Sequence, residues 1–524
     1  MKKISSKILA SLAIGGTLAF GAVSCTDKFE DFNTNPDAPT PDQMEGDFAS
    51  TASLLGNMIP MMVQGQENNF QMLDQMCGYD YGRMIACSNH WGSDQYFGTY
   101  NPLWGWSGSV FDTTMPNTYT PFFMIRDLTD GSGLVYWWAD MIRIFATMRV
   151  SDCYGPVPFS KIGTGSDFAV AYDDMPTLYS SMLAELDKAI AGMKEAVNAN
   201  ASLFADADYI YAGDISKWIT FANTLKLRLA MRLINVEPAL AQATAEAAVN
   251  DAYGVISTPD QAAWSTFLPG GNSFHKVSWL WSEARVSADL QSYLQGYSDP
   301  RLAAYAVPDE SGNIVCLRNG IFHANNVKAD AKIYSMPNVN SRSPLLCISA
   351  SEAWFCRAEG ALRGGNMGGT AKQLYERGVR VSFEERVTGA DVDAYLASEA
   401  TPADYVDPYN SSYNHAAMTT ISPKYDENAT FQQNLERIMV QKWIGNYPNG
   451  WETWTDFRRT NYPKFFPVVS NMSQAGVSTQ RGMRRLPYPQ SEFNTNEANV
   501  KAAQAMLGGP DTGATDLWWA IKIN

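Results

Sequence analysis

Apolar side chains recur at intervals of three and four residues along much of this chain. Residues with that spacing lie on one face of an α-helix, so the pattern predicts amphipathic helices with a buried side. Between residues 176 and 193, for example, Tyr179, Leu183 and Leu186 fall on one face. The predicted helices cover residues 44–63, 134–150, 176–193, 215–235, 238–253, 349–363 and 370–383.

The stretch from Glu436 to Pro463 predicts two helices joined by a tight turn. Pro448-Asn449-Gly450 marks the turn, because proline fixes φ while asparagine and glycine tolerate positive φ. Trp443 precedes the turn at helical spacing, and Trp451 and Trp454 share a face after it. We interpret this hairpin as an aromatic-rich packing centre rather than as a ligand site.

Two stretches, about 68–119 and 257–344, lack a clear period and are predicted to be rich in loops. In the first, the run from His90 to Trp106 mixes rings with Gly, Asn, Ser and Asp. That mixture fits neither a helix face nor a strand; it favours loops that present rings beside amides and carboxylates. In the second, the spacing of Trp279 and Trp281 predicts that both lie on one side of a strand.

The helices after residue 349 resemble a tetratricopeptide unit. Ser349 and Glu352 have the spacing of a capping box, and Gly364-Gly365 can end the helix in a left-handed conformation. Small residues occur where two helices would cross, although no 34-residue period repeats along the chain. We therefore predict one mostly α domain over residues 42–524, a tetratricopeptide-like scaffold of helix pairs with an irregular loop-rich face and a few short strands.

The first 41 residues are predicted to serve export and anchoring. Residues 1–24 combine a basic start with a short apolar run, as in a secretory signal peptide. Ala22-Val23-Ser24-Cys25 resembles a bacterial lipobox, which predicts lipidation of Cys25; an unlipidated Cys25 is the alternative. Residues 25–41 would form a tether, whose acidic residues resemble the surface-export signal of Bacteroidetes lipoproteins. The body would then be anchored to the membrane rather than inserted in it.

The amino-acid composition narrows the class of molecule that this protein is expected to bind. Of the 524 residues, 45% are hydrophobic and 18% are charged, which is typical of a folded protein. The 15 Trp and 25 Tyr favour recognition of amphipathic partners, because their rings combine apolar area with a polar tip. A net charge of −15 argues against nucleic acid, which requires a basic face.

The sequence contains no established motif for catalysis or for metal binding. The chain has four His, none with a partner at helical zinc spacing, and lacks the GxSxG, Walker, GxGxxG and kinase motifs. Asp206, Asp208 and Asp214 could hold calcium, but we prefer a solvated face. Cys77 and Cys87 could form a disulfide, but buried thiols are preferred. We expect no enzyme, no cofactor and no metal, although a glycosidase-type carboxylate pair stays open.

Several motifs together resemble the SusD/RagB family of nutrient-binding outer-membrane lipoproteins. They occur in order from residue 25 to about residue 490, and together they are far more specific than any one alone. After the lipobox, the motifs are Asp31-Phe32-Asn33-Thr34-Asn35-Pro36, Asp152-Cys153-Tyr154-Gly155-Pro156-Val157-Pro158-Phe159, Asp208–Asp214 with Trp218 and Phe221-Ala222-Asn223, Asp299-Pro300-Arg301-Leu302, Ser351-Glu352-Ala353, the hairpin with Trp443, Trp451, Trp454 and Arg458-Arg459, and Leu486-Pro487-Tyr488-Pro489.

This resemblance implies a function as well as a fold. It implies a lipoprotein of the cell outer membrane that faces the exterior, binds a nutrient, and delivers it as a hinged lid to a SusC-like TonB-dependent transporter. The nutrient would be a glycan or oligosaccharide. A peptide is the main alternative, and an enzyme acting on surface glycans is a remote one.

Glycan-binding members of the family use aromatic platforms on loops, and the resemblance transfers that role to the run near His90. The expected ligand-binding residues are Trp91, Asp94, Gln95, Tyr96, Tyr100, Asn101, Trp104 and Trp106, with Trp279 and Trp281 as second choices. The alternative interpretation is that some of these rings pack the loops against the scaffold.

Overall fold

The computed structural model describes residues 49–89, 96–164, 169–321 and 333–521. The chain divides into two compact units, Met1–Ser53 and Leu54–Asn524. Helix α4 (Ala49–Met58) spans the boundary between them. The predicted signal peptide, Cys25 and the tether lie outside the described residues, and the account below concerns the second unit.

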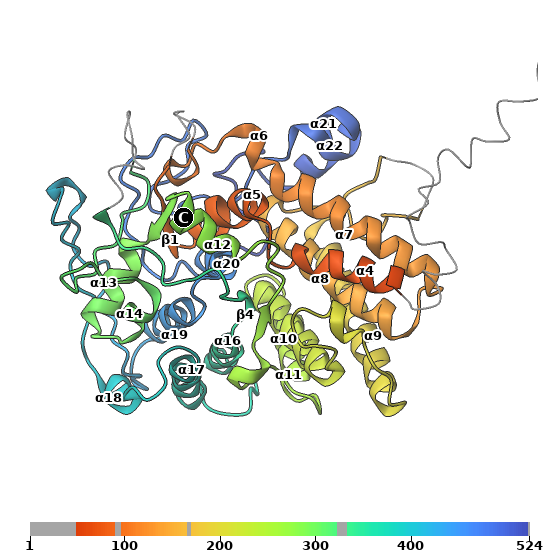
Figure 1. Ribbon diagram of the computed structural model, residues 1–524, viewed down its shortest axis with the longest axis horizontal. Helices are drawn as coiled ribbons and strands as arrows, with labels where there is room; N and C mark the ends of the chain where they lie inside the picture. The colour runs from red at the N-terminus through yellow and green to blue at the C-terminus, as the bar shows by residue number, and fades with distance from the viewer. Residues whose placement is uncertain (1–48, 90–95, 165–168, 322–332, 522–524) are drawn as a thin grey trace, which may run out of the picture. The chain divides into compact units, whose positions relative to one another are not determined.

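Packed helices make up most of this unit (Figure 1). Consecutive helices in the first half of the chain pack against one another, and so do those that follow residue 349. The first group is α7 (Ser109–Leu128), α8 (Gly133–Tyr154), α9 (Met175–Asn198), α10 (Ile215–Leu233) and α11 (Pro238–Val249). The second is α16 (Ala350–Leu362), α17 (Ala371–Arg386), α18 (Val392–Ala397), α19 (Phe431–Gly445) and α20 (Gly450–Thr460), followed by α21 (Gln490–Thr495) and α22 (Glu497–Met506). The predicted mostly α architecture of packed helix pairs is confirmed.

Side chains cap many of these helices at their N-terminal ends. Asp174, Asp214 and Thr370 each accept a backbone N–H from the first turn, which satisfies one of the free donors there. Ser349 does so for α16, with Glu352 N at 3.2 Å from its Oγ. The predicted capping box is only half right, because the carboxylate of Glu352 pairs with Arg228 instead, at 2.7 Å.

Two short antiparallel sheets interrupt the helices. Strand β1 (Ile85–Cys87) pairs with β3 (Ala284–Val286), so that Ile85 faces Val286 and Cys87 faces Ala284. Strand β2 (Ala263–Ser265) pairs with β4 (Leu345–Ile348) through an irregular register. Each sheet therefore joins segments that are far apart in the sequence.

The prediction of irregular structure over residues 68–119 is wrong in two places. Residues after 66 form α5 (Glu67–Phe70) and a π-helix, η2 (Gln71–Tyr79), and α7 begins at Ser109. Buried Asp74 and Gln75 hide the apolar period of η2, because each is hydrogen-bonded inside the core. Pro116 and Pro121 lie within α7; the buried apolar side of that helix outweighs the hydrogen bonds they remove.

The described residues between 257 and 344 form only short elements. These include η5 (Pro259–Gln261), α12 (Ser273–His275), the π-helix η6 (Lys276–Leu280), α13 (Ala288–Gly296) and α14 (Arg301–Tyr305). The predicted strand for Trp279 and Trp281 is wrong, since Trp279 lies in η6 and Trp281 follows it. A spacing of two residues does not place side chains on one side of a helix.

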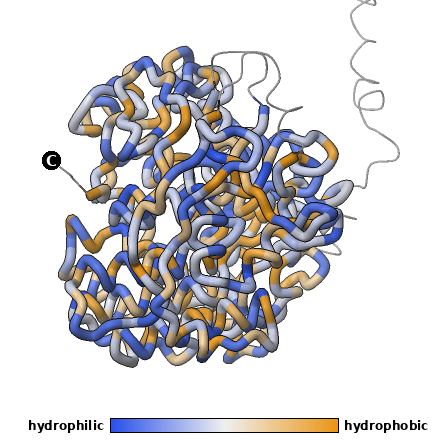
Figure 2. The backbone as a smooth tube through the Cα atoms, turned by 90° about the vertical axis from the view of Figure 1, so that its left-hand side faces the viewer, coloured by the Kyte–Doolittle hydropathy of each residue, from blue (hydrophilic) through white to orange (hydrophobic). Residues whose placement is uncertain are grey.

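One large apolar core runs through the helices, and a smaller one lies beside β1 and β3. Hydrophobic and hydrophilic residues alternate at short intervals along the tube in Figure 2, as expected when every helix has one buried face. Cys77, Cys87, Cys153, Cys316, Cys347 and Cys356 are free and buried, as preferred from the sequence. Within the described part of the chain, no helix has the length and apolarity needed to cross a membrane.

Candidate functional site

The two segments predicted to bind ligand start from the same small sheet. Strand β1 leads into Ser88 and Asn89, and η6 leads through Ser282 and Glu283 into β3. Ser88 N donates to Glu283 O at 3.1 Å, and Ser88 Oγ donates to Ser282 O at 2.9 Å. The structure therefore places Ser88 and Asn89, which precede the first-choice run, next to Ser282 and Glu283, which follow Trp281. Sequence spacing does not reveal this relationship.

Glu283 holds this junction against helix η2. Its side chain is buried, and its two carboxylate oxygens accept amide hydrogens from Asn89, at 2.8 Å, and from Gln71. Its backbone oxygen accepts from Gln75 Nε2 at 2.7 Å. Since Gln71 and Gln75 belong to the buried helix η2, the starts of both segments are tied to the scaffold.

A third segment reaches the same place through Asn319. Its Nδ2 donates to Ile85 O at 2.7 Å and also to the Asp80 carboxylate. Burial raises the pKa of Asp80 to about 6, against the opposing charge of Arg83 and the hydrogen bond from Asn319. The chain just before residue 322 is thereby held against β1.

Trp279 is the exposed ring at this junction. Its side chain has an exposed fraction of 39%, and the neighbouring Leu280 has 68%. The indole Nε1 donates to Pro337 O at 2.9 Å, and the His275 ring stacks on Trp279 with centroids 6.3 Å apart. One edge and one face of the indole are thus fixed by the protein, while part of the ring meets solvent.

Tyr96 and Tyr100 lie in the core, with exposed fractions of 1% and 4%. The Tyr96 hydroxyl donates to Cys87 O, and the Tyr100 hydroxyl accepts from Arg83 Nη2 at 2.8 Å. Rings buried to this extent offer no face to a ligand, so these two residues fit the alternative interpretation, in which rings pack the loop down.

The other predicted residues are divided between described and undescribed positions. Asn101 forms an isolated bridge with Tyr96, and Trp106 is half-buried against the core. Trp281 is half-buried in the same way. Trp104 starts the short helix α6 (Trp104–Ser107), and its side chain is not described. Trp91, Asp94 and Gln95 lie outside the described residues.

Sequence reasoning missed Asn89, Glu283 and Asn319. The first two had a signal, because each lies two residues from a predicted tryptophan. Asn319 had no such signal in the sequence, because its role depends on contacts with Ile85 and Asp80, more than 230 residues away.

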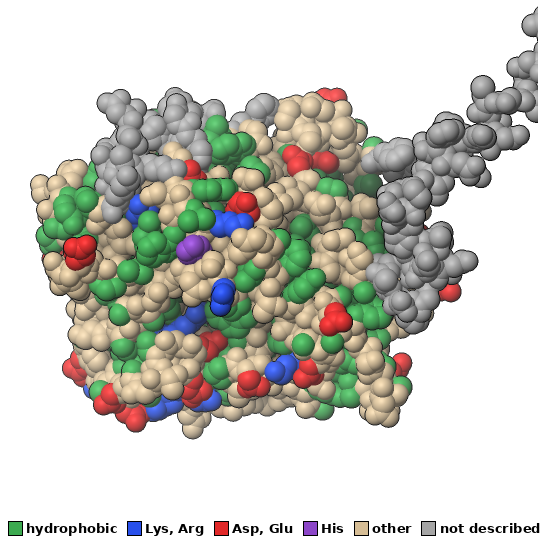
Figure 3. All heavy atoms as spheres, in the orientation of Figure 1, with side chains coloured by type: hydrophobic (Ala, Val, Ile, Leu, Met, Phe, Trp, Pro, Cys, Tyr) green, Lys and Arg blue, Asp and Glu red, His purple; other side chains and the backbone are tan. Residues whose placement is uncertain are grey.

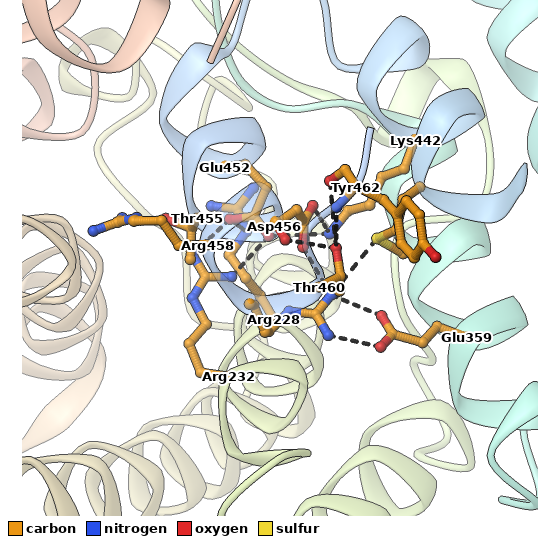
Figure 4. Close-up of polar contacts among 12 residues, drawn as sticks. Arg228, Arg232, Glu359, Lys442, Glu452, Thr455, Asp456, Arg458, Thr460 and Tyr462 are labelled. Carbon is orange, nitrogen blue, oxygen red and sulfur yellow. Dashed lines mark hydrogen bonds and ion pairs between the residues drawn. The ribbon is translucent and has the colours of Figure 1, made fainter. Parts of the chain in front are cut away.

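The hairpin of α19 and α20 holds a buried cluster of charges, shown in Figure 4. Lys442 Nζ lies 3.0 Å from Glu452 and 2.8 Å from Asp456. Arg228 and Arg232 of α10 also reach Glu452, while Arg459 of α20 binds Glu359 of α16. These side chains are at most 5% exposed, and Trp443, Trp451 and Trp454 are buried around them. The interpretation of the hairpin as a packing centre agrees with this burial.

Two of the three candidate calcium ligands, Asp208 and Asp214, act within the fold, whereas Asp206 is exposed. Asp208 is buried, which overturns its assignment to a solvated face. Its carboxylate accepts Gly213 N at 2.8 Å and the Trp218 indole at 2.7 Å, and Asp214 caps α10. Among the described residues, no three His, Cys, Asp or Glu side chains are grouped so as to hold a metal ion.

Comparison with known proteins gives a consistent result. The family model described as "SusD-like: Susd and RagB outer membrane lipoprotein" matches residues 31–520. A search of the curated proteins finds no match.

Solved structures of similar proteins cover nearly the whole chain. A chitin-binding SusD homologue from Flavobacterium johnsoniae is 34% identical, with a TM-score of 0.85 over 92% of this chain and 99% of its own. A SusD homologue from Bacteroides ovatus is 36% identical, with a TM-score of 0.84 over 91% of this chain and 100% of its own. A SusD-like protein from Bacteroides thetaiotaomicron is 35% identical, with a TM-score of 0.85 over 90% of this chain and 99% of its own. The chain therefore belongs to the SusD/RagB family of outer-membrane lipoproteins.

Proposed function

We propose that this protein binds a glycan at the junction of β1, β3 and η6 and delivers it to a SusC-like TonB-dependent transporter. The observation that carries the proposal is the exposed Trp279 ring at the point where the two predicted ligand-binding segments start. Family membership and the similarity to a chitin-binding homologue support it. The activity is binding and transfer, without a catalytic step.

The chemistry of the junction suits a sugar. A pyranose has an apolar face of C–H groups, which packs on an indole, and a rim of hydroxyls, which needs amides and carboxylates. The Trp279 ring is held by its hydrogen bond to Pro337 and by stacking on His275, so little conformational entropy is lost when a sugar binds. The amide of Asn89 and the carboxylate of Glu283 lie at the same junction.

The remaining predicted residues keep their proposed roles. Trp91 and Trp104 would extend the aromatic surface, and Asp94, Gln95 and Asn101 would bind hydroxyls beside them. Trp106 and Trp281 would contribute the outer edges of half-buried rings. Tyr96 and Tyr100 are reassigned to supporting the loop from beneath.

The proposed cellular location follows from the proposed lipid anchor at Cys25. Signal cleavage before Cys25 and lipidation of its thiol and amine would attach the protein to the outer membrane, with the body facing the exterior. There the protein would capture ligand and close on the transporter barrel, a change that binding drives only if the closed state holds ligand more tightly.

Trp279→Ala tests the site against a matched control. Phe431 has nearly the same exposed fraction, 38%, but lies at the start of α19. Isothermal titration with chitin oligosaccharides should show affinity lowered about ten-fold or more by Trp279→Ala and unchanged by Phe431→Ala, since one aromatic contact contributes roughly 1–3 kcal/mol.

Trp91→Ala and Trp104→Ala extend the test to the first-choice segment by affinity electrophoresis on polysaccharide gels. Retention equal to wild type for all three tryptophan variants, on a polysaccharide that retards wild type, would remove the site assignment. Binding of peptides in place of all tested glycans would favour the peptide alternative.

A further inference from the structure

A second groove lies next to the Trp279 junction, since its lining includes Asn338, which follows the residue whose backbone oxygen accepts the Trp279 indole N–H. It has a volume of about 410 Å³ and lies between the β2–β4 sheet, α14, the end of α17 and the turn after α19. The face shown in Figure 3 is hollowed below the region of α12, next to these elements. Pockets of this size accommodate small organic ligands.

Aromatic rings form much of the lining. Trp264 is half-buried on β2, between the buried residues Ala263 and Ser265. Tyr305 and Tyr447 stack with centroids 4.3 Å apart and ring planes 20° apart. Both tyrosine hydroxyls donate to backbone oxygens, at 2.9 Å and 3.3 Å. The two rings are only 1% and 5% exposed, so they form a fixed floor, and half-buried Trp264 is the ring that a ligand can contact.

Arg386 adds a positive charge to this lining. Its guanidinium carbon lies 4.9 Å from the Trp264 ring centre, and its Nη2 donates to Tyr447 O at 2.6 Å. Its Nε is buried and has no acceptor, and no carboxylate forms an ion pair with it among the described residues. Arg301 and Arg459 differ, because each is bound to carboxylates. Burial raises the pKa of the neighbouring Glu385 carboxylate and the charge of Arg386 opposes that rise, so the two groups interact without a contact ion pair. A half-buried guanidinium that no carboxylate contacts can still donate to a bound anion.

The rest of the lining is neutral. No Asp or Glu lines the groove. The carboxylate of Glu385, next to Arg386 in sequence, accepts the backbone N–H groups of Ala350 and Ser351 at the start of α16. Asn338 donates to Ala303 O at 3.3 Å, which leaves its side-chain oxygen as an acceptor. The groove thus offers the Trp264 ring, one amide oxygen and a guanidinium that no carboxylate contacts among the described residues, in a chain whose net charge is −15.

We propose that this groove is a second saccharide subsite that takes a sugar acid, a pyranose with a carboxylate substituent. The apolar face of the sugar packs on Trp264, the carboxylate accepts from Arg386, and a hydroxyl donates to Asn338. This inference rests on the proposed glycan-binding function. It adds a preference for acidic glycans that the Trp279 junction, with its Glu283 carboxylate, does not supply.

Matched ligands and variants test the charge contact. The ligands are trigalacturonate with its carboxyl-reduced form, and sialyllactose with lactose. At least one acidic member should bind wild type about ten-fold to one hundred-fold more tightly than its neutral partner, as expected for a hydrogen bond to a charged group. Arg386→Gln should abolish that difference, and Trp264→Ala should weaken both members of the pair.

Arg357→Gln is the matched control, because Arg357 also lies over a tryptophan ring, at 4.1 Å from Trp354, but outside the groove. It should leave the preference for the acid intact, and near-ultraviolet circular dichroism should report native packing for all variants. Equal affinity of wild type for acid and neutral forms in both pairs would overturn the inference, and so would a preference that survives Arg386→Gln.

The test of this subsite and the test of the proposed function can fail independently of each other. Trp279→Ala should weaken neutral chitin oligosaccharides and leave the acid preference unchanged, whereas Arg386→Gln should do the reverse. If a peptide with a free C-terminal carboxylate bound through Arg386, while its amide and all acidic sugars did not, the groove would be a peptide site and the sugar-acid assignment would fall.

Discussion

The indole Nε1 of Trp451 donates to Asp74 Oδ1 at 2.7 Å, which joins α20 to η2 across 377 residues of sequence. Arg149 donates to the same carboxylate oxygen at 2.6 Å and places its guanidinium 4.8 Å from the Trp451 ring centre. Burial raises the pKa of Asp74, against the charge of Arg149 and the indole hydrogen bond. This buried polar contact therefore helps to hold the first part of the scaffold against the last.

Trp451→Ala should lower the free energy of unfolding by about 3–5 kcal/mol, because it removes a buried ring and a donor to a buried carboxylate. Ligand affinity of the folded protein should stay close to wild type, since Trp451 lies in the core. Urea unfolding and calorimetric titration measure the two effects separately. Weaker binding at unchanged stability would contradict this structural role.

Gly450→Ala should destabilise the hairpin by about 1–3 kcal/mol through overpacking. A Cβ at Gly450 would lie 2.3 Å from both Gly78 O and the Cα of Tyr79, which are backbone atoms of η2 and cannot move aside locally. The control is Gly105→Ala, where nothing lies within 4 Å of the added carbon. Thermal melting of both variants checks the difference; equal melting temperatures would show that η2 and α20 adjust freely.

Glu359→Gln should remove a stabilisation that depends on pH. Glu359 accepts two hydrogen bonds from Arg459, at 2.6 Å and 2.7 Å. Burial disfavours the charged carboxylate, yet Arg459 and Arg363 outweigh it and lower the pKa of Glu359 to about 2 from 4.5. The folded state therefore binds this proton less readily than the unfolded chain. The stabilisation, about 3 kcal/mol, is complete above the unfolded pKa and is lost as the pH falls toward 2.

Urea unfolding at pH 7 and pH 3 tests the direction in which the stabilisation by Glu359 changes with pH. The stability gap between wild type and Glu359→Gln should be large at pH 7 and clearly smaller at pH 3. Glu384→Gln breaks an exposed pair with Arg377 and should cost under about 1 kcal/mol at either pH. A gap for Glu359→Gln that widens in acid would contradict the assigned charge state.

Cys25→Ala should release the protein from the membrane fraction, because several acyl chains provide stable anchoring and the loss of Cys25 removes their attachment point. Cell fractionation followed by immunoblotting measures the distribution, with Cys316→Ala as a control for loss of a buried thiol. Membrane retention of Cys25→Ala would show that another contact holds the protein there.

Local patterns were enough to locate much of the scaffold. Residues 176–193 fall inside α9, and the turn at Pro448-Asn449-Gly450 separates α19 from α20 as predicted. Caps at Asp214 and Thr370 also agree with side-chain chemistry that acts within four residues. These features depend on neighbours in sequence, which is the information that periodicity contains.

Features that depend on distant partners were missed or misread. Tyr96 and Tyr100 resemble loop platforms in sequence, but Cys87 O and Arg83 draw them into the core. The sequence predicts a strand at Trp279, because two tryptophans at a spacing of two give no sign of the π-helix that the structure contains. The groove around Arg386 combines residues from several segments that are far apart in the sequence, so no single stretch pointed to it.

The ion pairs between α10 and α20 also constrain how the chain reaches its native state. Arg232 of α10 binds Glu452, which is synthesised 220 residues later. Until that carboxylate is in place, a compact N-terminal half would have to bury an arginine with only part of its charge balanced, which is costly. We therefore expect folding to be cooperative over the whole body, unlike an array of independent repeats. C-terminal truncations that remove α20 should leave an aggregation-prone or protease-sensitive chain rather than a shorter stable scaffold.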